Sequence, residues 1–75
     1  MMAYVLISLQ HADEKKIQLA LQRNKEIKEI HILFGEWDIL AKLEISSAEE
    51  LGTFVMEKIR SMPEVKLTST MIVAK

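Results

Sequence analysis

Hydrophobic and polar residues change their spacing several times along this chain. Residues 3–9 are apolar almost throughout, which predicts a short strand in the interior of a sheet. A polar break at residues 10–13 follows, and Asp13 is a residue type that caps helix N-termini. Apolar residues then recur at helical spacing, which predicts an amphipathic helix that ends near Asn24. Its apolar positions are Ile17, Ala20 and Leu21.

Apolar and polar residues alternate over residues 29–34 and again over residues 39–45. Alternation with a period of two is typical of strands. The two runs flank the short loop Gly35-Glu36-Trp37-Asp38, and this combination predicts a β-hairpin. The residues that share one face are Ile30, Ile32 and Phe34 in the first run, and Ile39, Ala41, Leu43 and Ile45 in the second.

A second helix is predicted by a capping box, in which Ser47 is paired with Glu50 three positions later. Pro63 is expected to end this helix, because helices tend to stop before a proline. Alternation over residues 65–73 predicts a last strand. The apolar face of the helix is formed by Leu51, Phe54, Val55, Ile59 and Met62.

The resulting order, βαββαβ, predicts one α+β domain over residues 1–75 with the ferredoxin-like sandwich fold. In that fold two helices cover one face of a four-stranded antiparallel sheet and leave the other face open. The open face is expected to be too apolar for water, and a patch of this kind indicates a protein interface. We therefore predict a homodimer with the sheets facing each other. The residues assigned to this interface are Tyr4, Leu6, Leu33, Leu40 and Ile72.

Length and composition support association. A chain of 75 residues has a marginal core, and with no cysteine it has no disulfide to stabilise it. The formal net charge of −1 disfavours direct nucleic-acid binding, which needs a basic face. No stretch is apolar enough for a membrane span and none has the pattern of a signal peptide, so the cytoplasm is the expected location.

The residues that carry catalytic or metal chemistry do not form a recognisable motif. His11 and His31 lie on different elements without a neighbour at ligand spacing, so neither a metal nor a cofactor is expected. A catalytic carboxylate pair could be drawn from Glu36 and Asp38, but turn carboxylates ordinarily cap the backbone or are solvated. No serine stands in a nucleophile motif, and there is no glycine-rich phosphate loop. We therefore do not expect an enzyme.

Two features are unusual. One is the loop of residues 35–38, which holds the only Trp and one of two glycines, and the other is the run Thr68-Ser69-Thr70. Each has an ordinary explanation: a tight turn in which Gly35 adopts a positive φ, and an edge strand with β-favouring residues. Together, a carboxylate turn and a row of hydroxyls complement a zwitterion that carries an ammonium and a carboxylate.

The chain resembles the effector domain of the Lrp/AsnC family, called RAM for regulation of amino acid metabolism. The resemblance covers essentially the whole chain. Its motifs are Gly35-Glu36-Trp37-Asp38-Ile39-Leu40, Leu51 and Phe54, Met62-Pro63-Glu64-Val65, and Thr68-Ser69-Thr70-Met71-Ile72-Val73.

The resemblance implies a protein that senses an amino acid. Domains of this family pair through their sheets, and the dimers assemble into rings, commonly of four, with amino acids bound between neighbouring dimers. The Gly-x-x-Asp turn contacts the amino acid from one subunit and strand hydroxyls contact it from another. By position, these residues are Gly35, Glu36, Trp37 and Asp38, with Thr68, Ser69 and Thr70.

Full-length members of the family also carry an N-terminal helix-turn-helix, whereas this chain starts at the first strand of the effector domain. We therefore expect a stand-alone effector domain with no DNA-binding domain, which acts by joining full-length relatives in mixed oligomers. The family often has Tyr where Trp37 stands.

Two other kinds of protein remain open. One is a small dimeric ferredoxin-like enzyme, such as a cofactor-free oxygenase or isomerase, for which His31 is the plausible general base. The other is an assembly module that binds no ligand.

Overall fold

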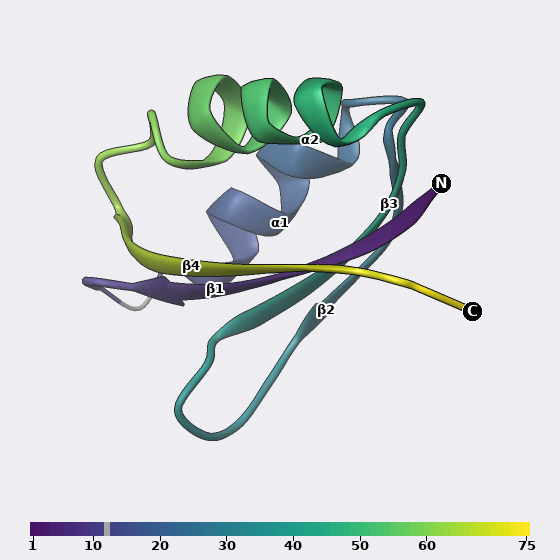
Figure 1. Ribbon diagram of the computed structural model, residues 1–75. Coiled ribbons are helices and arrows are strands. Elements are labelled where there is room, and N and C mark those ends of the chain that lie inside the picture. The colour runs from purple at the N-terminus through teal and green to yellow at the C-terminus, as the bar shows by residue number, and fades with distance from the viewer. Residues whose placement is uncertain (12) are drawn as a thin grey trace.

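A computed structural model describes residues 1–11 and 13–75 (Figure 1). Residue 12, which belongs to the polar break after the first strand, lies outside the described residues. None of the helices in the described ranges is long and apolar enough to cross a membrane. The elements are β1 (Met2–Leu9), α1 (Glu14–Gln22), β2 (Ile27–Ile32), β3 (Ile39–Glu44), α2 (Ala48–Phe54), the π-helical turn η1 (Val55–Ile59) and β4 (Val65–Ile72).

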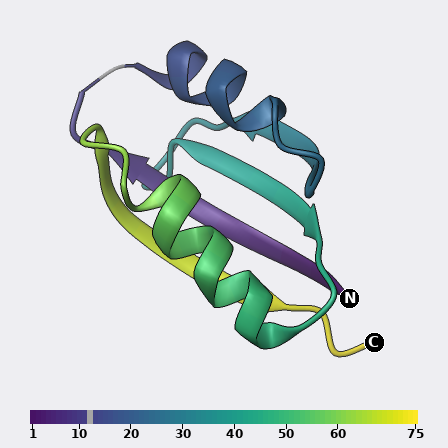
Figure 2. The same cartoon turned by 90° about the horizontal axis from the view of Figure 1, so that it is seen from above.

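The four strands form one antiparallel sheet in the order β2-β3-β1-β4. Both helices lie on the same side of this sheet, as Figures 1 and 2 show. The ferredoxin-like fold expected from the order of elements is therefore confirmed. The central strands are β3 and β1, and β2 and β4 form the two edges.

The core lies between the sheet and the helices. On β1 the alternate residues Ala3, Val5 and Ile7 are fully buried. Their partners on β3 are Leu43, Ala41 and Ile39, which are fully buried as well. The helices cover these rows with Ile17, Leu21, Leu51, Phe54, Val55 and Ile59.

The two predicted helix caps have different outcomes. The Ser47 side chain accepts the backbone N–H of Glu50 at 3.1 Å, as the capping box requires. The Glu50 carboxylate bonds to the hydroxyl of Ser46 instead of reaching back to the backbone of Ser47. Asp13 occupies the predicted N-cap position of α1, where its carbonyl accepts the Ile17 N–H at 3.1 Å, but its side chain makes no capping bond. Its ψ of 32° lies outside the extended conformation of a normal N-cap residue.

The second helix and the β2–β3 hairpin are both shorter than their patterns predicted. The helical segment ends at Ile59, so Met62 packs against the core from the following turn and not from the helix. Strand β2 ends at Ile32, and Phe34, predicted to continue its alternation, is fully exposed in the loop. The reason is local: the Leu33 N–H bonds to the Asp38 carbonyl at 2.8 Å, and the residues between them form the loop.

Register defines the two faces of the sheet. Residues opposite each other in an antiparallel pair share a face, so Leu6, Leu40 and Ser69 form one row on the open face. Tyr4 lies in the adjacent row with Lys42 and Met71. Leu33 is half-buried just beyond the end of β2.

The placement predicted for Ile72 is wrong. It pairs with the fully buried Ala3, so its side chain is on the helix side of the sheet. Its apolar character assigned Ile72 to the open face, but the face depends on the register with β1.

Candidate functional site

The loop of residues 35–38 has the backbone conformation expected from its glycine. Gly35 has a φ of +133°. It is the only residue in the described part of the chain with a positive φ. Glu36 is exposed, while Trp37 and Asp38 are half-buried. The hairpin carries this loop away from the helices at one end of the sheet (Figure 1).

Asp38 is held against the end of β1 by two hydrogen bonds. Its carboxylate Oδ2 accepts the Leu9 N–H at 2.7 Å, and its own N–H donates to the Ile7 carbonyl at 2.9 Å. The pairing of β1 with β4 shifts register between Ser8 and Leu9, so the Leu9 N–H lies at an irregular point of the sheet. The Asp38 carboxylate therefore satisfies a backbone donor and keeps one orientation. Because a carboxylate has about four acceptor positions, it retains capacity for a further donor.

The run Thr68-Ser69-Thr70 is divided between the two faces of the sheet. Thr68 and Thr70 pair with the fully buried Ile7 and Val5, so their side chains are on the helix side. Ser69 pairs with Leu6 and lies on the open face. The three hydroxyls therefore do not form one row: two belong to the helix side and one to the open face.

The two threonines line a surface groove, about 400 Å³ in volume, between β4 and the second helix. We call it the β4–α2 groove. Its helical wall includes Arg60, whose N–H bonds to the Val55 carbonyl at 2.8 Å in the wide turn of η1. The residues that line the groove are Ala48, Leu51, Gly52, Val55, Met56, Arg60, Thr68, Thr70 and Ile72.

The loop and the threonines are separated within one protomer. Ile39, next to the loop, and Thr68 flank Ile7 from opposite sides, because β1 lies between β3 and β4. Two strand spacings correspond to about 10 Å between the backbones. The Ile7 side chain fills the row between them on the helix side. One protomer therefore does not bring the two predicted halves of the site into contact.

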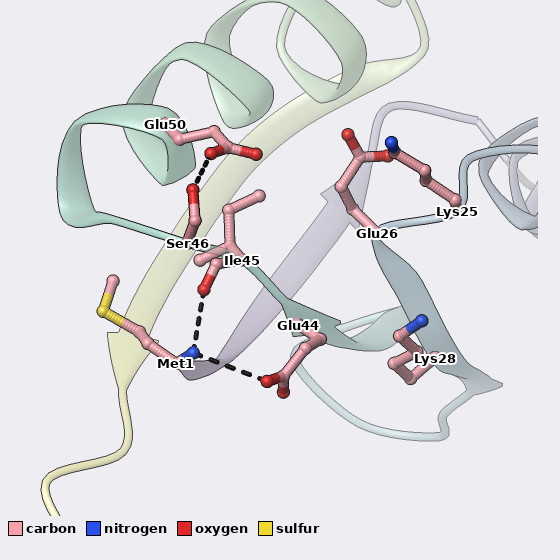
Figure 3. Close-up of a pocket in the computed structure, with 8 residues that line it drawn as sticks. All are labelled: Met1, Lys25, Glu26, Lys28, Glu44, Ile45, Ser46 and Glu50. Atoms are coloured by element: carbon pink, nitrogen blue, oxygen red, sulfur yellow. Dashed lines mark hydrogen bonds and ion pairs between the residues drawn. The ribbon is translucent and has the colours of Figure 1, made fainter.

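A second concave surface lies at the other end of the sheet (Figure 3). It has a volume of about 380 Å³, and it combines positive and negative groups. The Met1 ammonium donates to the Ile45 carbonyl at 2.8 Å and lies 3.5 Å from Glu44 Oε1. The residues that line it are Met1, Lys25, Glu26, Lys28, Glu44, Ile45, Ser46 and Glu50.

Among the described residues, neither a cluster of metal ligands nor the histidine of the alternative enzyme lies in these concave surfaces. Within residues 1–11 and 13–75 no three metal-ligating side chains form a cluster. His31, the base of the alternative enzyme, is exposed on the open face and lies 3.1 Å from Glu29 Oε1. That hydrogen bond, with a second from Lys42, holds the pKa of Glu29 below its ordinary value. His31 lines neither of the two concave surfaces described above.

Sequence reasoning did not identify the helical wall of the groove. Gly52, Met56 and Arg60 fall on the polar side of the predicted helix, which is normally solvated. Nor did the alternation of residues 29–34 predict that Phe34 is exposed. Both features depend on where an edge strand lies and where a strand ends, which a single sequence does not specify.

These features define the class of the protein. It is a ferredoxin-like α+β domain with candidate polar groups on a turn and on an edge strand. A family model described as the Lrp/AsnC ligand binding domain matches residues 2–75, and the chain belongs to that family.

The chain is similar to two proteins named as transcriptional regulators and to one solved structure of about its own length. An uncharacterized HTH-type transcriptional regulator of Pyrococcus furiosus is 39% identical over 59 residues, which are 79% of this chain and 39% of the regulator. The proline dehydrogenase transcriptional activator of Rhizobium radiobacter is 32% identical over 74 residues, which cover 95% of this chain and 47% of that protein. The chain thus spans less than half of either regulator. The crystal structure of FFRP-DM1 is similar with a TM-score of 0.90, 36% identity and coverage of 96% of both chains. Relatives named as regulators do not favour the alternative of an enzyme.

Proposed function

We propose that this domain binds a small amino acid between protomers and that binding changes its assembly and, through relatives, transcription. The observation that carries the proposal is the division of the site. The carboxylate turn and the Thr68 and Thr70 hydroxyls are polar groups of complementary chemistry that β1 keeps apart within one protomer. A second protomer supplies the missing half.

The chemistry of the two halves matches a zwitterion. The Asp38 carboxylate accepts a hydrogen bond from the ligand ammonium with the capacity that remains beside its bond to Leu9, and residues 35–37 offer backbone amides or carbonyls. The hydroxyls of Thr68 and Thr70 bond to the ligand carboxylate or side chain from the neighbouring protomer. Ser69, on the opposite face of β4, contributes only if the ligand or a subunit contact reaches that face.

The relatives support an amino acid as the ligand. The activator from Rhizobium radiobacter is named for proline dehydrogenase, an enzyme that acts on an amino acid. A ligand that bridges protomers stabilises the assembly that completes its site. By linkage, assembly raises the affinity for the ligand by the same factor.

Association starts at the open sheet face in this proposal. Tyr4, Leu6, Leu40 and Met71 form an apolar surface there, and facing sheets bury it in a homodimer. Further contacts between dimers form a ring of about four dimers, or a mixed ring with full-length relatives that bind DNA. Such a regulator works in the cytoplasm, without direct nucleic-acid contact by this domain.

A thermal-shift screen with the twenty amino acids, combined with light scattering, tests the proposal. We expect a subset of amino acids at millimolar concentration to raise the melting temperature and to change the size of the assembly. If no amino acid changes either quantity, the proposal is wrong.

The Asp38 variants separate ligand binding from folding. Asp38→Asn keeps an oxygen acceptor for the Leu9 N–H and removes the negative charge, so we expect near-normal stability and loss of the amino-acid response. Asp38→Ala also leaves the Leu9 N–H without this acceptor and should cost about 1–3 kcal/mol of stability. An unchanged amino-acid response in Asp38→Asn would exclude Asp38 as the ammonium partner.

A further inference from the structure

One cation of the β4–α2 groove has no partner within the protomer. Arg60 lines the groove and makes no ion pair in the part of the chain that the structure describes. A guanidinium can donate two parallel N–H groups to one carboxylate, which makes arginine the side chain best suited to this anion. Exposed arginines are ordinarily solvated, so the surroundings of Arg60 decide whether it belongs to a binding site.

The shape of the helix places Arg60 in the groove wall. In a regular α-helix each step of four residues turns the side chain by about 40° around the axis. The Arg60 N–H bonds to the carbonyl of Val55, five residues earlier, and this wider turn offsets the rotation. Gly52, Met56 and Arg60 therefore line the same groove. Wide turns of this kind are frequent at functional sites.

The groove has a polar end and an apolar end. The helix and β4 run in opposite directions, because the short segment of residues 60–64 connects them (Figure 2). Arg60 therefore lies at the end of the groove where β4 begins, as does Thr68. The opposite end is lined by Ala48 and Ile72.

Charge balance selects the group that Arg60 binds. In the proposed function the ligand carries one ammonium and one carboxylate, and Asp38 neutralises the ammonium. The threonine hydroxyls are uncharged, so without a cation the site would hold one excess negative charge. Arg60 supplies that cation. A basic ligand side chain would find no anion among the residues that line the groove, and an acidic one would restore the excess negative charge.

We propose that Arg60 binds the carboxylate of the amino-acid ligand and that the rest of the groove selects an uncharged, apolar side chain. This inference rests on the proposed function and names the ligand class of that site. The ligand side chain lies along Met56 toward Ile72, two apolar residues that are exposed to solvent. The groove volume of about 400 Å³ is ample, since a cavity of about 150 Å³ holds a benzene ring.

Variants of Arg60 test the carboxylate contact. We expect Arg60→Gln to raise the concentration of apolar amino acid needed for a given thermal shift about tenfold or more. Arg60→Lys keeps the charge without the planar fork and should lose less. Lys58→Gln is the matched control, because Lys58 is an exposed cation of η1 that does not line the groove. Equal responses in wild type, Arg60→Gln and Lys58→Gln would overturn the proposal, as would a stronger response to acidic or basic amino acids than to apolar ones.

A carboxylate without an ammonium tests the groove separately from the turn. The probe is 4-methylpentanoate, which has an aliphatic chain and no group for Asp38 to bind. We expect it at millimolar concentration to shift the NMR signals of Thr68 and Met56 in the wild type and not in Arg60→Gln. Its neutral amide is the chemical control and should have a much smaller effect. Equal effects of the acid and the amide, including no effect of either, would contradict a carboxylate site at Arg60.

Gly52 offers a test of side-chain selection. A Cβ built on Gly52 meets no atom within 4 Å, and this residue lines the middle of the helical wall. Gly52→Leu should fill part of the groove and shift the response toward smaller amino acids such as alanine. Thr53→Leu is the control, because Thr53 is an exposed residue of α2 that does not line the groove. The same selectivity in both variants as in wild type would exclude the groove as the side-chain site.

The outcomes separate this inference from the proposed function. Binding of 4-methylpentanoate that depends on Arg60, without any change of assembly by an amino acid, supports the groove site and contradicts the sensor. An amino-acid response of full strength in Arg60→Gln supports the sensor and contradicts the role of Arg60.

Discussion

At the scale of single residues, backbone conformation decides whether either of the two glycines can be replaced by a larger residue. Free space does not limit the replacement at either position. A Cβ atom built on Gly35 or on Gly52 meets no atom within 4 Å. Gly35 has a φ of +133°, a conformation that side chains with a Cβ rarely adopt, whereas Gly52 lies in α2. The positive φ predicted for Gly35 from its place in a short hairpin loop is confirmed.

Alanine at these two positions should therefore have opposite effects. We expect Gly35→Ala to lower the free energy of unfolding by about 1 kcal/mol or more, because alanine is strained at this φ. We expect Gly52→Ala to raise it by about 0.5–1 kcal/mol, since alanine has the higher helix propensity. Urea denaturation at one protein concentration measures both. Effects of the same sign would contradict this explanation.

Individual hydroxyls show the limit of prediction at this scale. The composition of the run 68–70 indicated three polar groups on one strand, and that is correct. Strand alternation divides the three side chains between the two faces of the sheet. The pairing of Thr70 with Val5 decides which side chains are on the helix side and which is on the open face. The same pairing moves Ile72 off the open face.

At the scale of elements, one ion pair joins α1 to the segment that leads into β4. Lys16 Nζ lies 2.6 Å from Glu64 Oε2, and the Glu64 carbonyl accepts the Gln10 N–H at 2.9 Å. The hydrogen bond from Lys16 holds the pKa of Glu64 below its ordinary value of 4.5. The same bond raises the pKa of Lys16 above its ordinary value of 10.5.

These two shifts define the pH range in which the ion pair stabilises the fold. A lowered carboxyl pKa contributes stability above pH 4.5 that is lost as the pH falls through the lowered value. A raised lysine pKa contributes stability below pH 10.5 that is lost as the pH rises through the raised value.

Lys16→Met should therefore raise the pKa of Glu64 toward 4.5, as measured by NMR titration of its carboxyl carbon. Its stability deficit relative to wild type should be present at neutral pH and disappear in acid, and added salt should reduce it. Lys15→Met, which removes a neighbouring charge without an ion pair in the described residues, is the control. An unchanged Glu64 titration in Lys16→Met would show that the ion pair is absent in solution.

At the scale of the whole molecule, the sheet has one covered and one uncovered face. On the uncovered face Leu6, Leu40 and Met71 are apolar, while the ion pair of Glu29 and Lys42 lies beside His31 toward β2. The apolar part is the surface through which we expect two copies to associate. The charged part limits that surface to β1, β4 and the adjoining end of β3.

Leu6→Lys should weaken this association by about 2 kcal/mol or more, roughly 30-fold in Kd, because it places a charge in the apolar surface. The side chain points away from the core, so the protomer should keep its secondary structure, with lower stability because a small domain loses the support of its partner. Analytical ultracentrifugation of Leu6→Lys and of Leu19→Lys, on the opposite side of the molecule, measures the difference. Dimers of equal affinity in both variants would exclude the open face as the interface.

The sequence by itself determined the order of elements, the fold class and the family. Those properties depend on local patterns: the period of apolar residues, a serine at a helix N-terminus, a glycine in a short loop and a few motif residues. Each pattern lies within about ten neighbouring residues, so no distant contact was needed to identify it.

Only the tertiary structure decided which residues share a face and which remain exposed. Register between strands distant in sequence set the faces of Ile72 and of the Thr68–Thr70 run, and the end of β2 left Phe34 in water. The bond from Leu9 to Asp38 and the groove that includes Arg60 join residues that are also far apart along the chain. These features arise from long-range pairing and packing, where a shift of one residue moves a side chain to the other face.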